Sequence, residues 1–163
     1  MPNDQRTRGV RPDVSNLRTI QQYAAQAISR NELTRAAAQA AMEKATRPDV
    51  REIAGYELME AKAVISCLKE LGAPVPPLGP DARSALETIS NASRGNAFDR
   101  AYIAAQCENH AFLRDLTAAY LECGDPQPSD PRERQGRQLA AMALCMATEH
   151  AAVTNRISRE MRG

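Results

Sequence analysis

Apolar residues recur at three- and four-residue steps along most of this chain, which is the period of an amphipathic helix. No glycine or proline interrupts this pattern through the first long stretch, and proline or glycine marks the breaks between the later ones. The pattern therefore predicts four long helices, over residues 14–46, 48–71, 97–123 and 131–161.

The connections between these helices differ in length. The first and third are short turns. Residues 72–95 begin with four prolines in nine residues, which is typical of an extended connector, and carry a short helical pattern over 81–93. A long second connection can cross a bundle from end to end, as in ferritin-like folds. We therefore expect an all-α, ferritin-like four-helix bundle over residues 14–163, with the short extra helix inside the connector, and a disordered tail over residues 1–13.

Side chains that can cap a helix stand at all four predicted starts. Asp13 or Ser15 precedes the first helix, Thr46 the second, Asn96 the third and Asp130 the fourth, where Pro131 follows directly.

The composition favours helices and argues against several classes of function. Of the 163 residues, 29 are alanine and only 4% are aromatic, which favours helix over sheet. A net charge of +1, two phenylalanines and no tryptophan argue against the basic stripe and stacking platform of a nucleic-acid binder.

No apolar run approaches the roughly eighteen residues of a membrane span. Residues 1–13 contain no signal-peptide core, so we expect a cytoplasmic protein, or a periplasmic or exported one whose leader has been removed.

Several polar side chains fall on or beside the apolar faces of the predicted helices, at about 100° per residue. Glu57 lies near the centre of the face of the second helix, with Glu60 at its margin. His150 lies at the centre of the face of the fourth helix, and His110 and Gln106 sit on the flank of the third. These positions predict polar groups inside the bundle.

A buried carboxylate requires a cation, a hydrogen bond or a raised pKa. Glu57, His110 and His150 are therefore interpreted either as a polar centre or metal site, with Glu60 beside it, or as a structural hydrogen-bond network. If such a polar centre exists, the Glu57 carboxylate is inaccessible to solvent and hydrogen-bonded.

The spacing of the candidate ligands does not fit a di-iron centre. Such a centre takes Glu from two helices and a Glu-x-x-His pair from each of the other two. The chain has two histidines, and their nearest preceding acids, Glu108 and Glu149, are too close in sequence to share a metal with them on a regular helix. A di-iron oxidase is therefore the least favoured metal-dependent function.

The cysteines are scattered singly and form no C-x-x-C motif, so no zinc or redox motif is predicted. Cys107 with His110, or Cys145-Met146 with His150, leaves a soft copper site as a weaker alternative. No nucleophile elbow or phosphate-binding loop is present, so no catalytic residue is predicted. The cysteines, whose redox state the sequence leaves open, are Cys67, Cys107, Cys123 and Cys145.

Roughly residues 20–157 resemble a known family, and one motif carries the resemblance most specifically. Phe98-Asp99-Arg100-Ala101-Tyr102-Ile103, followed by His110 and later by His150, is similar to the bacterial domain-of-unknown-function 4142 family. The resemblance implies a ferritin-like fold and no established activity. It also implies export, because members are often labelled outer-membrane or exported proteins. The positions that it marks as shared with the family are Asp99, Tyr102, His110 and His150.

The chain departs from that family's pattern at two positions. Ala61 stands where the family usually has a histidine, and Thr34 where it usually has a glutamate. Both departures weaken any metal site shared with the family.

These observations together predict a bacterial, non-catalytic binding or interaction module. The alternative is a metal-binding bundle in which Glu57, His110, His150 and Glu60 hold iron or copper. Apart from this transition metal no cofactor is expected. A homo-oligomer and a protein partner both stay open.

Overall fold

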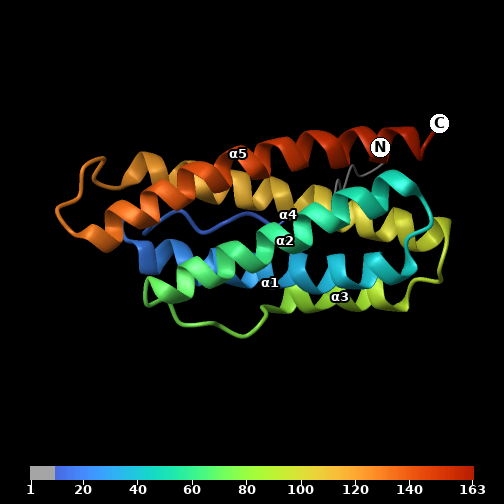
Figure 1. Cartoon of the computed structure of the whole chain (residues 1–163), viewed down its shortest axis with the longest axis horizontal. Coiled ribbons are helices and arrows are strands. Elements are labelled where there is room, and N and C mark those ends of the chain that lie inside the picture. Colours follow the sequence, from blue (N-terminus) through green and yellow to red (C-terminus); the bar gives the residue numbers. More distant parts are fainter. Residues whose placement is uncertain (1–9) are drawn as a thin grey trace, which may run out of the picture.

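The computed structural model describes residues 10–163, which form five helices and no strand (Figure 1). The all-α class predicted from the sequence is thereby confirmed. No helix in this part of the chain combines the length and the apolar character needed to cross a bilayer. The five helices are α1 (Ile20–Lys44), α2 (Pro48–Glu70), α3 (Pro80–Asn91), α4 (Asn96–Cys123) and α5 (Pro131–Glu160).

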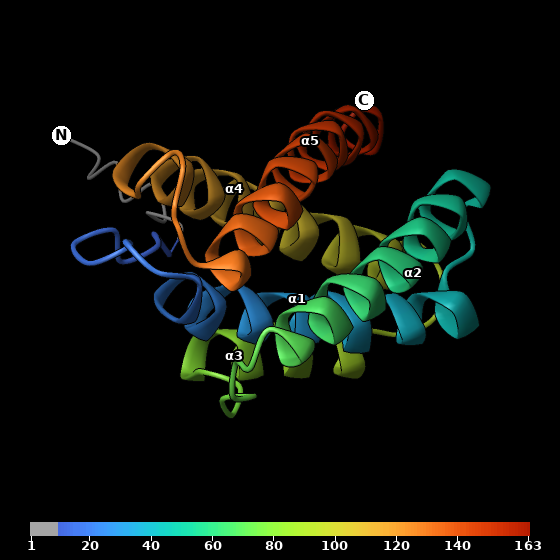
Figure 2. The same cartoon turned by 60° about the vertical axis from the view of Figure 1, so that its left-hand side comes forward.

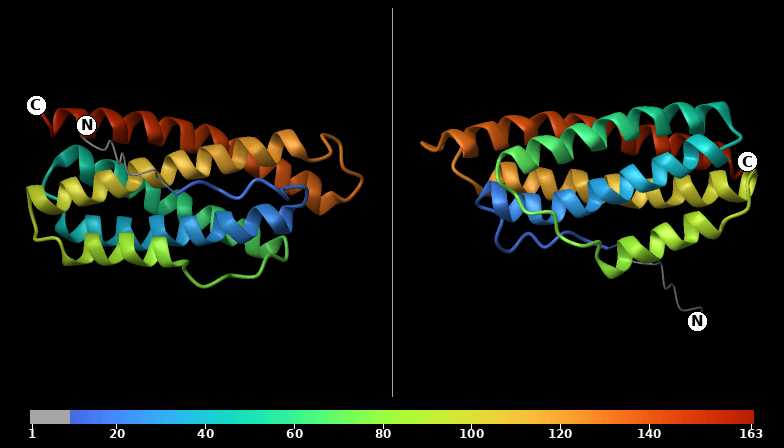
Figure 3. Two further views of the ribbon diagram at one scale, coloured as in Figure 1. Left: turned by 180° about the vertical axis from the view of Figure 1, so that it is seen from behind. Right: turned by 60° about the horizontal axis from the view of Figure 1, so that its bottom comes forward.

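The four long helices lie side by side along the molecule, and α3 packs on the outer side of α1 (Figures 1 and 3). The most extensive contacts join α4 to α5 and α1 to α2, whereas α2 meets α5 far less extensively (Figure 2). The connector after α2, together with α3, carries the chain back along the whole molecule. For this reason α2 and α4 run in the same direction.

The first helix begins six residues later than expected. Its N-cap is Thr19, whose side chain accepts from the backbone of Gln22 in a capping box. The expectation that Asp13 or Ser15 is the cap is wrong, because Asp13 accepts instead from the backbone and hydroxyl of Ser15, at 3.0 and 2.6 Å. Leu17 lies in the buried core before the helix starts.

The predicted tail, residues 1–13, falls mostly outside the described residues. Of its described part, Asp13 is held against α1 by two hydrogen bonds with the side-chain amide of Gln26, at 2.9 and 2.7 Å.

The other helix bounds differ from the expected ones by only one or two residues. The N-cap of α2 is Arg47, which makes no side-chain cap bond, rather than Thr46. The N-cap of α4 is Gly95, at φ 109°, rather than Asn96, which is the first helical residue. Asp130 caps α5 as expected and accepts from the backbone of Arg132. Glu133 accepts from the backbone N–H of Ile20 at 2.9 Å, and so joins the start of α5 to the start of α1.

The buried apolar side chains form two clusters, one toward each end of the long helices. Between the clusters lies a layer of buried polar residues contributed by α1, α2, α4 and α5. We call it the polar layer. Its members are Asn31, Thr34, Glu57, Gln106, Asn109, His110, His150 and Thr154.

Asp99 joins the α1–α2 turn to α4 at the end of the molecule beyond this layer. Its fully buried carboxylate accepts from the backbone N–H and the hydroxyl of Thr46, at 3.1 and 2.7 Å, and from the backbone N–H of Arg47 at 3.0 Å. These bonds satisfy amide groups that the start of α2 leaves without a helical partner. Asp99 therefore sets how α2 sits against α4.

Replacing Asp99 by alanine should lower the free energy of unfolding by about 3 kcal/mol, because buried donors lose a charged acceptor. The same change at exposed Asp115, also on α4, should cost less than about 0.5 kcal/mol. Chemical denaturation followed by circular dichroism measures both, and equal losses in the two variants would contradict this role.

Candidate metal centre

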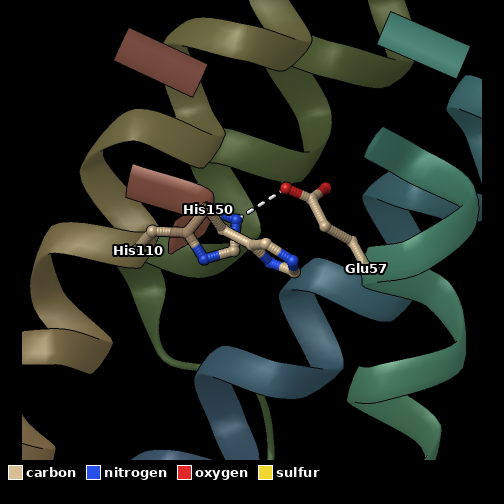
Figure 4. A group of neighbouring side chains, drawn as sticks. All are labelled: Glu57, His110 and His150. Carbon is tan, nitrogen blue, oxygen red and sulfur yellow. Dashed lines mark hydrogen bonds and ion pairs between the residues drawn. The ribbon is translucent and has the colours of Figure 1, made fainter. Parts of the chain in front are cut away.

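Three side chains from three helices meet inside the polar layer. Glu57 of α2, His110 of α4 and His150 of α5 each present a ligand atom, and these atoms lie within 4.8 Å of one another (Figure 4). All three residues are buried. The structure therefore brings together the three residues that the helical pattern selected.

The local sequence explains why these side chains face inward. Glu57 stands one turn from Ala54 and Ala61 on the buried face of α2, and His150 lies between Ala147 and Ala151 on α5. His110 is only 3% exposed, although it was expected on a flank. Because α4 packs on both α1 and α5, its buried face is wider than its apolar stripe.

The carboxylate of Glu57 is surrounded by donors from α4. One oxygen accepts from the hydroxyl of Tyr102 and, at 2.6 Å, from the side-chain amide of Gln106. The other lies 2.6 Å from Nε2 of His110. The expectation that this carboxylate is buried and hydrogen-bonded is confirmed. Burial and the charge of Glu57 raise the pKa of Tyr102 well above its ordinary value, so the phenol remains a donor.

Glu60 and His150 form a second pair beside the first, with 3.1 Å between Oε2 and Nε2. Burial, reinforced by the charge of Glu57, raises the pKa of Glu60. Burial, reinforced by neighbouring His110, lowers the pKa of His150. The two imidazole rings meet edge to face with 5.0 Å between centroids. A neutral imidazole is the form that binds a metal.

A cavity of about 40 Å³ adjoins these four side chains. A water molecule occupies roughly 10–15 Å³ on this measure, so the cavity has room for an ion and a water. Ala61 and Thr34, the two positions where the chain departs from the resembled family, line this cavity too. The alanine at position 61 therefore leaves open space in the cavity where the family usually has an imidazole. The threonine at position 34 places a hydroxyl there instead of a carboxylate.

Tyr102 and Gln106 were not expected to hold Glu57. Tyr102 was marked by the family resemblance, and Gln106 as a flanking residue, but neither was assigned as a partner of Glu57. The signal that could have found them is their spacing, because Tyr102, Gln106 and His110 stand four residues apart on one face of α4.

The cysteines take no part in this cluster. Within residues 10–163, no group of three or more candidate ligands contains a cysteine. Cys107 is half-buried and the other three are exposed, and all four are unpaired thiols. The geometry thus supports imidazole and carboxylate ligands rather than a site with cysteine ligands. Met146, the other residue of the soft copper alternative, does line the cavity with His150.

The family model described as "Domain of unknown function (DUF4142)" matches residues 7–157. The chain belongs to this family. No curated protein and no solved structure matches it. In this DUF4142 chain the match takes in Glu57, Glu60, His110 and His150, so the whole cluster lies within the family domain.

Replacing Tyr102 by phenylalanine removes one donor from a buried carboxylate and should lower the free energy of unfolding by about 1–3 kcal/mol. The matched control is Tyr56→Phe, because Tyr56 is 50% exposed on α2 and should change stability by less than about 0.5 kcal/mol. Urea denaturation provides the comparison. A Tyr102 variant as stable as the control would show that the phenol does not support Glu57.

Proposed function

We propose that this DUF4142 chain is a metal-binding protein that holds one divalent transition-metal ion between Glu57, His110 and His150. The observation that carries the proposal is the convergence of three buried ligand atoms, from three helices, within 4.8 Å and beside a cavity. This favours the metal-binding alternative over the interaction module expected first from the sequence.

The donor set selects a class of metal. Two imidazoles and one carboxylate suit iron(II), zinc and neighbouring first-row ions, and the same combination forms the facial triad of non-haem iron sites. Ligand atoms bound to one such ion at about 2.0–2.2 Å lie roughly 3–3.5 Å apart. Small side-chain rotations would bring the three atoms from within 4.8 Å to that separation.

A metal-free hydrogen-bond network is the competing interpretation, because Glu57 already has three partners. Charge favours the metal. Glu57 and Glu60 bring two carboxylates to the cluster from α2, and among residues 10–163 their ion-pair partners within 4.0 Å are the two imidazoles, which carry charge only when protonated. A divalent ion supplies the positive charge that neutral imidazoles do not.

The site is proposed to hold one ion rather than two. Among the residues that line the cavity, α1 contributes Asn31, Thr34 and Tyr23, none of which is a carboxylate or an imidazole. A di-iron centre of the ferritin type takes ligands from all four helices of its bundle. A di-iron oxidase is therefore not proposed.

We further propose that α1, α2, α4 and α5 form a ferritin-like four-helix bundle. The long connection between α2 and α4 supports this, because it makes these two helices run in the same direction, as a bundle with one crossover requires. An experimental structure with α2 and α4 antiparallel would contradict it.

Protein purified without chelator and then titrated with zinc or iron(II) should bind one equivalent, measured by elemental analysis and calorimetry. His110→Gln and His150→Gln should each weaken binding by at least about tenfold, because each removes a direct ligand. Glu108→Gln is the matched control, since Glu108 is an exposed acid two residues before His110 and should retain wild-type affinity.

Two results would contradict the metal site. One is a folded wild-type protein that binds less than about 0.1 equivalent of zinc, iron(II), manganese(II) and copper(II). The other is stoichiometric binding that both histidine variants retain at wild-type affinity.

A further inference from the structure

The metal centre has an outer and an inner pair of side chains. Exposure of the side chains falls from 33% at Glu60 and 10% at His150 to 4% at His110 and 0% at Glu57. On the inner side the cluster is closed by Tyr102 and Gln106, both fully buried. Glu60 and His150 are therefore the side of the cluster that reaches solvent.

Glu60 and His150 also line a second hollow, a surface groove of about 350 Å³ between α2 and α5. They are the residues common to the groove and the cavity. The Glu60–His150 pair, 3.1 Å apart, thus stands as the partition between solvent and the buried ligands. The groove runs along the boundary between α2 and α5. These two helices contact each other less extensively than α4 contacts α5 or α1 contacts α2.

The charge of the groove favours cations. Four carboxylates and one guanidinium line it, from Asp49, Glu52, Glu60, Glu149 and Arg156. Asp49 is neutralised by Arg47 at 2.7 Å, and Arg156 by Glu160 at 3.0 Å. Within residues 10–163, neither Glu52 nor Glu149 has an ion-pair partner within 4.0 Å.

A concave, low-dielectric wall lined by one sign of charge concentrates ions of the other sign and raises their rate of arrival. The remaining groove residues supply that wall. They are the apolar or aromatic side chains of Ile53, Tyr56, Val153 and Ile157.

We propose that the α2–α5 groove is the route by which a hydrated divalent cation enters and leaves the centre, and that Glu60 is the first carboxylate to bind it. Glu60 then releases Nε2 of His150, and the ion passes inward to Glu57, His110 and His150. This inference rests on the proposed metal-binding function and adds the path and the order of contact.

The first test follows zinc binding by stopped flow, in competition with a chromophoric chelator. Glu52→Gln/Glu149→Gln should lower the association rate constant about three- to tenfold at low ionic strength, and the difference should vanish in high salt. The control is Glu43→Gln/Glu122→Gln, which removes the same two charges from exposed positions outside the groove and should bind at the wild-type rate.

A second variant blocks the groove without altering charge. Val153→Trp should slow association and dissociation of zinc by the same factor and leave the dissociation constant unchanged, because an obstructed path affects both directions equally. Met142→Trp, at a 67% exposed position of α5 outside the groove, should leave both rates unchanged. The block tests the route even if the charge effect is small.

The outcomes separate this inference from the function on which it rests. Wild-type protein that takes up one zinc, with both groove variants loading and unloading at wild-type rates, would overturn the route and leave the site intact. Wild-type protein that takes up no zinc would overturn both. Equal slowing in the groove variants and in their controls would also overturn the route.

Discussion

The buried carboxylate of Glu57 is the constraint on which the centre of this molecule depends. A carboxylate removed from water is costly unless hydrogen bonds or a cation stabilise its charge. Here α4 supplies three donors at four-residue intervals, from Tyr102, Gln106 and His110. This requirement fixes the register between α2 and α4, and Asp99 reinforces it where α4 meets the α1–α2 turn.

The same carboxylate explains why the core is divided. Two apolar clusters pack the ends of the long helices, and the polar layer interrupts them in the middle. Well-packed apolar residues would generally stabilise such a core at least as well as a buried ionic group. A layer that holds a buried carboxylate and two imidazoles beside a cavity therefore supports the proposed ligand rather than a role in stability. The alanines of α2 and α5 contribute by leaving room beside Glu57 and His150.

Much of this architecture could be predicted from the sequence. Helical periodicity, proline and glycine placed the helices within one or two residues, except at the start of α1. There a local capping box at Thr19 and Gln22 competes successfully with Asp13 and Ser15, and buried Leu17 lies before the helix begins. Local cap preferences do not reveal which of several candidates the tertiary contacts favour.

The site was predictable in part. The positions of Glu57 and His150 at the centres of their faces were visible in the helical pattern, because each face is defined by its own apolar residues. His110, Tyr102 and Gln106 were harder to place. Their burial depends on how α1 and α5 cover α4, and their role depends on the approach of a carboxylate from α2. Neither contact is encoded in the periodicity of a single helix.

The most direct test of the metal centre is anomalous diffraction from crystals of the zinc-loaded protein, recorded on both sides of the zinc absorption edge. We expect one strong anomalous peak in the cavity, about 2.0–2.2 Å from a carboxylate oxygen of Glu57 and from a ring nitrogen of both His110 and His150. An empty cavity in crystals grown with excess zinc, with anomalous peaks only at surface carboxylates, would contradict it.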